Sequence, residues 1–327
     1  MRVGLIDVDA SARGKVTFPN LPLMKISAFW KAQGASVEWW KPDAERYDVV
    51  YMSKVFGDEY TPDLPEPENA SVVIRGGSGY AIYVRDGKEH YCKSRDTDLN
   101  EAIEHIMPDY ALYGITDTAY GFLTKGCPCR CEFCHVAEMQ GTTVRTVADL
   151  SEFWSGQKNI KLLDPNLTAS PDWEKHVRAL SESNAYIDFT QGLSAKMLTN
   201  EKIEDLNAVR WKMIHFAWDR PEENLEPHFE RIMSRLNKAR RQTVSAYVLT
   251  NNGSTHEQDL YRIMTLRKLD IQPYVMIYRK STAPKETRKL QRWCNPFIFW
   301  KVPTFEEYQK RTLVECAEKD QGGGTTK

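Results

Sequence analysis

The sequence predicts an α/β protein, in which a small parallel α/β domain precedes a partial barrel of six β/α units. Two observations predict this class. Apolar runs typical of strands alternate with runs of helical spacing, and this alternation indicates parallel strands joined by helices. The alternation occurs twice, first within residues 1–110 and then, more regularly, within residues 111–305. Six strand–helix units in succession are typical of a parallel barrel or an open part of one.

The first region begins with RVGLIDVD at residues 2–9, which predicts a strand that ends in acidic residues. Residues 21–34 have apolar side chains at helical spacing and end at Gly34, which predicts a helix and its stop. The sequence VRDGKEHY at residues 84–91 predicts a small hairpin. Further strands are predicted over residues 36–40, 47–56 and 70–79.

The second region carries the six predicted β/α units. Strands are predicted over residues 120–125, 159–164, 185–190, 213–219, 243–250 and 272–278. Helices are predicted between them over residues 147–154, 171–184, 224–241 and 256–269. Residues 306–327 are expected to form a C-terminal helix and a disordered tail, because EKDQGGGTTK is poor in apolar residues.

The composition is that of a globular protein with one large domain or two ordinary ones. The 327 residues carry a formal net charge of −1, so there is no evident footprint for nucleic acid. No apolar run is long enough to span a membrane, and MRVGLIDVDA lacks the features of a signal peptide. We therefore expect a cytoplasmic protein without a membrane partner. Thiols stay reduced in that compartment, so clustered cysteines indicate metal or redox chemistry.

Four of the seven cysteines lie within eight positions, at Cys127, Cys129, Cys131 and Cys134. Three of them, Cys127, Cys131 and Cys134, have the spacing C-x3-C-x2-C. Thiolates are the usual ligands of iron–sulfur clusters, and three thiolates leave one iron of a 4Fe–4S cluster open. An open iron can bind a substrate or cofactor, so the spacing favours catalysis over electron transfer alone.

Two other kinds of site use clustered cysteines. A structural zinc site has four ligands, typically in two separated pairs, and no second pair follows this segment. A redox dithiol needs only Cys131 and Cys134. The corresponding alternatives are a non-catalytic iron–sulfur or zinc-binding protein and a thiol oxidoreductase.

The segment GCPCRCEFC resembles the signature of the radical S-adenosylmethionine (radical SAM) superfamily, in which an aromatic residue, here Phe133, precedes the last cysteine. The preceding FLTKGCP is also similar, and the resemblance extends over about residues 115–300. It implies a partial (β/α)6 barrel of radical SAM type, with a 4Fe–4S cluster on Cys127, Cys131 and Cys134. It also implies that Phe133 lies near the adenine of SAM and that Cys129 is not a ligand.

The resemblance further implies an activity. The open iron would bind the amino and carboxylate groups of S-adenosylmethionine, which one electron cleaves to methionine and a 5′-deoxyadenosyl radical. The radical would abstract hydrogen from a substrate that the sequence does not identify. The electron would come from an external one-electron reductant such as flavodoxin or ferredoxin.

Five residues after the second, third and fourth strands of the series are candidates for binding SAM. Asp164 and Asn166 stand where the superfamily often has a glycine-rich segment that holds the SAM amino group; the alternative is an Asx turn and helix cap. Gln191 and Gly192 are expected at the barrel mouth, or else in an ordinary turn. Asp219 is a candidate for a ribose hydroxyl, or for a helix cap.

The last two strands are followed by further polar residues. Thr250, Asn251 and Asn252 are candidates for contact with adenine, by the same resemblance. Arg279 is a candidate for a carboxylate or phosphate, or else a solvated loop residue.

The first region faintly resembles the Rossmann-like cobalamin-binding domain that precedes the barrel in one radical SAM branch. The resemblance rests on RVGLIDVD, on the predicted helix and on IRGGSG at the end of a late strand. The histidine motif of that domain is absent, although many members bind cobalamin without it. The resemblance makes a cobalamin-dependent radical SAM methyltransferase the second functional hypothesis, and a degenerate domain that serves packing or recognition is its structural alternative.

Overall fold

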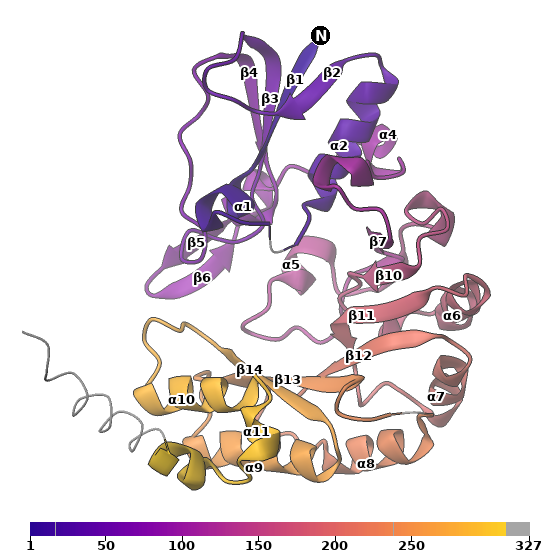
Figure 1. The fold of residues 1–327 in the computed structure, drawn as a ribbon, viewed down its shortest axis with the longest axis vertical. Helices are drawn as coiled ribbons and strands as arrows, with labels where there is room; N and C mark the ends of the chain where they lie inside the picture. The colour runs from indigo at the N-terminus through magenta and orange to yellow at the C-terminus, as the bar shows by residue number, and fades with distance from the viewer. Residues whose placement is uncertain (17, 238, 312–327) are drawn as a thin grey trace, which may run out of the picture. The chain divides into compact units, whose positions relative to one another are not determined.

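The computed structural model describes residues 1–16, 18–237 and 239–311, and it is a mixed α/β structure built on two parallel sheets (Figure 1). The described chain divides into two compact units, one within residues 1–188 and one that begins at residue 189. The predicted α/β class and its parallel sheets are therefore confirmed. The domain boundary predicted near residue 110 and the partial barrel stay predictions.

A four-stranded parallel sheet belongs to the first unit and has the strand order β2-β1-β3-β4. Its strands are β1 (Arg2–Asp7), β2 (Ser36–Trp39), β3 (Tyr47–Ser53) and β4 (Ala70–Gly76). The central strands β1 and β3 are almost wholly buried, as expected for apolar runs covered on both faces. One face packs on α2 (Leu21–Ala32) through a core that includes Leu5, Leu23 and Ile26.

Strand β1 ends earlier than its apolar run predicts, because Asp7 begins a helix. The Asp7 carboxylate accepts a hydrogen bond from the Ala10 backbone N–H at 2.9 Å and caps the short helix α1 (Val8–Arg13). Asn20 caps α2 in the same way, since its Oδ1 accepts from the Leu23 N–H at 3.1 Å. Side-chain capping therefore sets where both helices begin.

Short elements connect this sheet to the next one. They are α3 (Ser78–Ala81), β5 (Ile82–Arg85), β6 (Lys88–Tyr91), η1 (Lys93–Arg95), α4 (Glu101–Glu104) and η2 (Tyr110–Tyr113). Strands β5 and β6 pair antiparallel, which confirms the predicted hairpin.

The second sheet has six strands in the order β14-β13-β12-β11-β10-β7, so its spatial order follows the chain. The strands are β7 (Thr118–Gly121), β10 (Asn159–Leu162), β11 (Tyr186–Leu193), β12 (Trp211–Ala217), β13 (Val244–Thr250) and β14 (Gln272–Ile277). All six overlap the predicted strands.

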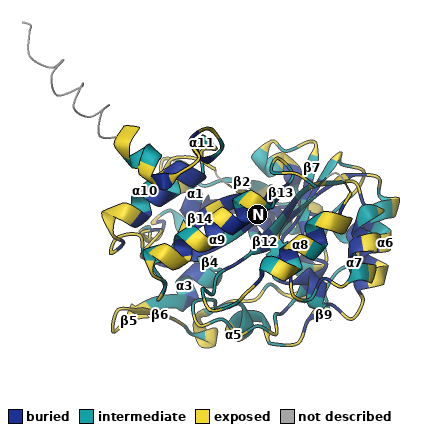
Figure 2. Cartoon of the chain, turned by 90° about the horizontal axis from the view of Figure 1, so that it is seen from below, coloured by how far each residue is buried: buried dark blue, intermediate teal, exposed yellow. Residues whose placement is uncertain are grey.

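Helices alternate with these strands. They are α6 (Trp173–Glu182), α7 (Asn200–Asn207), α8 (Glu226–Arg235), α9 (His256–Lys268), α10 (Lys285–Cys294) and α11 (Ile298–Lys301), with the 3-10 turn η4 (Leu167–Ala169) before α6. Figure 2 shows α8 and α9 with both buried and exposed sides, as amphipathic helices have. The predicted helix over 147–154 is only the 3-10 turn η3 (Leu150–Glu152). Residues 305–311 are helical, and the rest of the predicted C-terminal helix and tail lies outside the described residues.

The predicted strand over residues 120–125 is broken into β7 and the two-residue strand β8 (Thr124–Lys125). A Cβ added to Gly121 would lie 2.3 Å from the Phe153 ring, so only glycine allows this close packing at the break. Strand β8 then pairs antiparallel with β9 (Arg145–Thr146) and leaves the parallel sheet. The chain is thereby redirected just before the cysteine segment.

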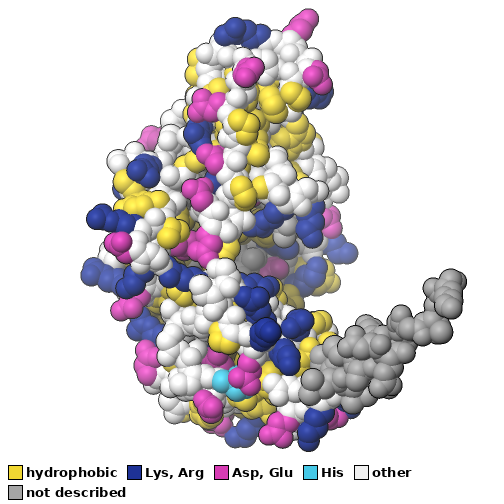
Figure 3. Space-filling view, turned by 90° about the vertical axis from the view of Figure 1, so that its left-hand side faces the viewer, with side chains coloured by type: hydrophobic (Ala, Val, Ile, Leu, Met, Phe, Trp, Pro, Cys, Tyr) yellow, Lys and Arg dark blue, Asp and Glu magenta, His cyan; other side chains and the backbone are white. Residues whose placement is uncertain are grey.

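The surface carries charges of both signs. On the face shown in Figure 3, basic and acidic side chains are interspersed with apolar and uncharged surface. Among the helices of the described residues, none is long and apolar enough to cross a lipid bilayer.

Candidate active site

The cysteine segment lies on a loop whose two ends are fixed to each other. The pairing of β8 with β9 closes this cysteine loop, residues 126–144. The Cys127 N–H donates to the Gly141 carbonyl at 3.1 Å, and the Gly126 N–H donates to Gln140 Oε1 at 3.1 Å. The helix α5 (Val136–Gln140) lies within the loop. The cysteines therefore lie on a loop whose two ends are held next to each other.

Gly126 makes this closure possible. Its backbone has φ of +99°, a conformation that L side chains rarely adopt, and a Cβ there would lie 2.3 Å from the Thr143 carbonyl oxygen. Gly141 has φ of +91°, but a Cβ there would meet no atom within 4 Å. Gly126 is therefore required for space as well as for backbone conformation.

None of the four cysteines of the loop is in a disulfide, and all four are partly exposed. A hydrogen bond with the Cys129 thiol is the largest cause that lowers the pKa of Cys127 to about 6, against the effect of burial. The Cys129 backbone N–H and the Asn166 amide lower this pKa further. The lowered pKa favours the thiolate form of Cys127, which is the form that binds metals.

Within residues 1–16, 18–237 and 239–311, no group of three or more His, Cys, Asp or Glu side chains is arranged to hold a metal ion. The cysteine tripod therefore stays a prediction. Its donor chemistry fits an iron–sulfur cluster, because Cys127, Cys131 and Cys134 are thiols outside any disulfide on one short loop with a fixed base. Ligands of this kind are commonly ordered by the metal itself.

Asn166, a residue predicted from the sequence, contacts the cysteine loop. Its Nδ2 donates to the sulfurs of Cys127 and Cys129, each at 3.6 Å, and its Oδ1 accepts from the Thr168 hydroxyl at 2.6 Å. Asn166 is buried and begins η4, but its side chain makes no capping hydrogen bond. The side chain of Asn166 therefore does not act as the helix cap that was its alternative role.

Asp164 has a supporting contact that the sequence did not predict. Its Oδ1 accepts from the Thr124 N–H at 2.5 Å and from the Thr124 hydroxyl at 2.7 Å, and its Oδ2 accepts from the Leu123 N–H at 3.2 Å. Burial raises the pKa of Asp164 to about 6, although these hydrogen bonds favour the ionised form. The carboxylate joins the end of β10 to the residues that lead into the cysteine loop.

A cavity of about 610 Å³ lies next to the cysteine loop within the first unit. Ser53 and Gly76, at the carboxyl ends of β3 and β4, line it from one side. Lys125, Gln140 and Arg145, at the base of the cysteine loop, line it from the other. Ligands of parallel α/β sheets bind at the carboxyl ends of strands, so this cavity is the first candidate for a ligand.

An ion pair crosses the edge of this cavity. Lys125 Nζ lies 2.8 Å from Glu104 Oε1, and Lys25 Nζ lies 3.5 Å from the same oxygen. Burial alone would raise the pKa of Glu104, but the hydrogen bond from Lys125 and the two lysine charges outweigh it, and this pKa is lowered. The pair connects α4 to the strand that precedes the cysteines. Lys125 adjoins the motif and was detectable from the sequence, whereas Glu104 carried no signal.

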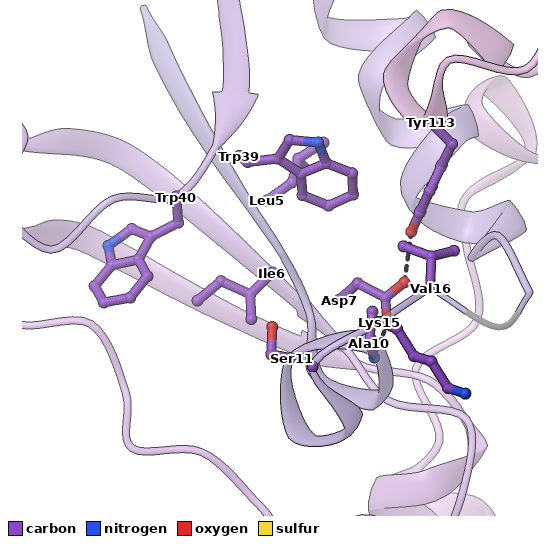
Figure 4. A pocket seen from close by; sticks show the side chains of 11 residues that line it. Leu5, Ile6, Asp7, Ala10, Ser11, Lys15, Val16, Trp39, Trp40 and Tyr113 are labelled. Atoms are coloured by element: carbon purple, nitrogen blue, oxygen red, sulfur yellow. Dashed lines mark hydrogen bonds between the residues drawn. The ribbon is translucent and has the colours of Figure 1, made fainter.

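A second cavity, of about 350 Å³, lies at the carboxyl ends of β1 and β2 (Figure 4). Its walls include Trp39, Trp40 and Tyr113. The Tyr113 hydroxyl donates to Asp7 Oδ2 at 2.6 Å, and burial raises the pKa values of both groups. Asp7 is already used as the cap of α1, so its carboxylate is a structural group at the base of an aromatic cavity.

The glycines of IRGGSG serve internal packing. A Cβ on Gly77 would lie 2.4 Å from the Lys54 carbonyl oxygen, and one on Gly79 would lie 2.5 Å from the Phe56 carbonyl oxygen. These two glycines therefore allow the chain to pack on its own backbone, and they are not evidence for a phosphate-binding turn. Gly76 has ordinary contacts and lines the 610 Å³ cavity.

The remaining predicted positions have varied settings. Phe133 is partly exposed on the cysteine loop, in the first unit. In the second unit, Gln191 and Gly192 belong to β11, which is longer than predicted; Gln191 is exposed and Gly192 has φ of +99°. They therefore lie within a strand and not in a turn after it.

Asp219 follows β12 and belongs to a buried polar network in the second unit. Burial raises its pKa to about 6, against the charge of Arg262 and a hydrogen bond from the Leu249 backbone. Arg262 donates to the Trp218 carbonyl at 2.5 Å and to the Leu249 carbonyl at 2.9 Å, and it pairs with Asp259. Asp219 does not cap α8, whose N-cap is Leu225.

Comparison with known proteins does not identify the chain. Neither a protein-family model nor a curated protein sequence matches it.

We expect Asp164→Asn to change how stability depends on pH. The folded pKa of Asp164 is raised, so the native state binds more protons than the unfolded state between about pH 4 and pH 6. Its contribution to stability is full below this window and is lost as the pH rises through it. The free energy of unfolding of the wild type relative to the variant should fall by about 3 kcal/mol across the whole window. Urea unfolding of both proteins between pH 5 and pH 7.5 measures the upper part; a relative stability that rises with pH contradicts the assignment.

We expect Gly126→Ala to open the base of the cysteine loop. The methyl group would overlap the Thr143 carbonyl, and the left-handed backbone adds about 1–2 kcal/mol of strain. Limited proteolysis should then cut within residues 126–144 faster than in the wild type. Gly141→Ala is the matched control, because it carries strain without overlap and should have the smaller effect on both proteolysis and the unfolding midpoint. Equal effects would show that close packing at Gly126 is unimportant.

Proposed function

We propose that this protein is a radical SAM enzyme. The observation that carries the proposal is the C-x3-C-x2-C segment on a closed loop, which follows β7, the first of six parallel strands in chain order, and the short strand β8. The lowered pKa of Cys127 supports it, because a lowered pKa favours the thiolate, the form that binds iron.

The residues have distinct roles in this proposal. Cys127, Cys131 and Cys134 would hold a 4Fe–4S cluster, which when bound supplies the open iron and the electron for cleavage of SAM to a 5′-deoxyadenosyl radical. Asn166 would donate a hydrogen bond to the sulfur of Cys127, a contact that tunes cluster potential. Phe133 would contact adenine. SAM contacts from Asp164, Gln191, Gly192 and Asp219 remain part of the proposal.

The 610 Å³ cavity is the proposed place for the substrate or a second cofactor. It reaches Lys125, two residues before the first cysteine, so a ligand within it would lie close to the loop that generates the radical. Its walls combine apolar residues such as Phe122 and Met139 with charged residues such as Lys93 and Asp98. A ligand with an apolar body and polar groups at its edge fits this lining.

The same cavity favours a second candidate function, cobalamin-dependent methyl transfer. It lies at the carboxyl edge of a four-stranded parallel sheet, where a corrin would have to bind for its methyl group to reach a substrate beside the cysteine loop. Binding of hydroxocobalamin, measured by its visible spectrum after gel filtration, tests this candidate. Absence of binding removes methyl transfer and leaves hydrogen abstraction.

Anaerobic reconstitution with iron and sulfide tests the leading proposal. We expect a brown protein with about four irons per chain, because three cysteines suit a 4Fe–4S cluster. Addition of SAM and dithionite should release 5′-deoxyadenosine. A colourless protein that holds one zinc per chain would instead support the zinc-binding alternative, and a brown protein that never cleaves SAM would support a non-catalytic iron–sulfur protein.

Alanine variants of the same preparation identify the ligands. Cys127→Ala, Cys131→Ala and Cys134→Ala should each abolish the cluster, while Cys129→Ala should keep it. Cys92→Ala is the matched control, because Cys92 is a partly exposed free thiol outside the loop. Loss of iron in Cys129→Ala, with iron retained in one of the other three, would show that the ligand assignment is wrong.

A further inference from the structure

Arg279 lies two residues after β14, at the carboxyl end of the last strand of the six-stranded sheet. Its Nε and Nη2 atoms are buried, and within the described residues neither has a hydrogen-bond partner. Arginine keeps its charge in proteins, so both groups remain hydrogen-bond donors at every physiological pH. Leaving such donors unpaired is unfavourable, and a native structure needs a reason for it.

The two unpaired atoms form one edge of the guanidinium. Nε–H and an N–H of Nη2 point the same way in the planar group, which is the geometry that binds both oxygens of a carboxylate or phosphate. The guanidinium carbon also makes a cation–π contact with Tyr278, 5.5 Å from the ring centroid. The side chain thus offers two adjacent N–H donors to a single ligand group.

The backbone that carries Arg279 is held firmly. Arg279 has φ of +47° and Asn251, at the end of the neighbouring strand β13, has φ of +61°. The Asn251 amide donates to the Tyr278 carbonyl at 2.7 Å, and the Thr282 N–H donates to the Arg279 carbonyl at 3.0 Å. Left-handed backbone at residues other than glycine is costly and occurs where surrounding structure enforces it, often at ligand sites. Two adjacent strand ends share this conformation here.

The adjoining loop and helix start add positive charge. Residues 279–288 contain four basic residues and one acidic residue, Glu286, whose carboxylate lies 3.6 Å from the His256 ring. Arg288 is fixed by hydrogen bonds from its Nη2 to the carbonyls of Lys280 and Ser281, each at 2.9 Å. Its Nε is also buried without a partner in the described part of the chain. The charge of this segment favours an anion.

We propose that Arg279 is a binding site for an oxyanion, the carboxylate or phosphate group of a small-molecule ligand. The site does not depend on the proposed radical chemistry. The proposal rests on the buried Nε and Nη2 donors, on the firmly held backbone of Arg279 and on the basic residues around it. All lie at the carboxyl end of a parallel strand, which is where ligands of such sheets bind. No residue of the cysteine loop is part of it.

The test uses the full-length protein with inorganic phosphate and, separately, acetate as probes, at constant ionic strength adjusted with chloride. We expect a saturable rise of the unfolding temperature with at least one probe, as preferential binding to the folded state requires. The probe that binds more tightly identifies the group as phosphate or carboxylate. Equal effects of phosphate, acetate and chloride would overturn the proposal.

Three variants make the result specific to Arg279. Arg279→Gln should weaken binding at least about tenfold, and Arg279→Lys should weaken it less, because lysine keeps the charge but loses the paired donors. Arg292→Gln is the matched control, since Arg292 is exposed on α10 and loses the same charge. If Arg292→Gln and Arg279→Gln weaken binding equally, the effect is general electrostatics and the proposal fails.

A second readout does not use a ligand. In buffer without phosphate or carboxylates, Arg279→Gln should be close to the wild type in stability, because it removes two buried N–H donors without partners in the described residues and gives up only the cation–π contact with Tyr278. A marked fall in the unfolding temperature of Arg279→Gln would show that the guanidinium is paired within the protein, and would overturn the proposal. Folding is verified in the same experiment by a cooperative transition.

Discussion

The hydrogen bonds of Asp164 are the constraint on which the candidate site depends. One buried carboxylate takes the N–H groups of Leu123 and Thr124, and so fixes the chain where it leaves the parallel sheet. The cysteine loop begins two residues later and has no strand partner of its own beyond the β8–β9 pair. Since Asn166 lies two residues after Asp164, the same turn also brings an amide to the first cysteine. The turn at residues 164–166 therefore both fixes the start of the cysteine loop and contacts its first cysteine.

The small N-terminal sheet is connected to this loop by charge. Lys125 reaches Glu104 of α4, and α4 packs on α2, which covers the sheet. The 610 Å³ cavity is enclosed by these same elements, so the sheet edge and the loop base form its opposite walls. A ligand at the carboxyl end of β3 and β4 would thus contact groups that also position the cysteines. Under the proposed function, the N-terminal region would take part in ligand binding, whether the ligand is a substrate or a corrin.

Periodicity predicted most of the strands, because buried parallel strands are continuous apolar runs that the sequence displays. It failed where side chains redirect the chain: Asp7 ends β1 as a cap, and Gly121 and Asp164 break the strand over 120–125. The role of a glycine is equally hard to predict from the sequence. Gly77 serves internal packing and Gly126 closes a loop, yet nothing local in the sequence separates the two. The cysteine spacing was visible at once, whereas Glu104 depends on a long-range contact and left no pattern.

Buried polar groups fix the strand ends in both units, and two of them find their hydrogen-bond partners within the protein. Asp164 has three donors, and Arg262 joins the ends of β12 and β13 through two carbonyls and Asp259. In each case the polar group is satisfied by the protein, so its removal should weaken the fold. Arg279 occupies the equivalent place after β14, but its donor edge has no partner in the described residues. The backbone at Arg279 is also firmly held. In the proposed oxyanion site a ligand would supply the partner of Arg279, whereas the protein itself supplies the partners of Asp164 and Arg262.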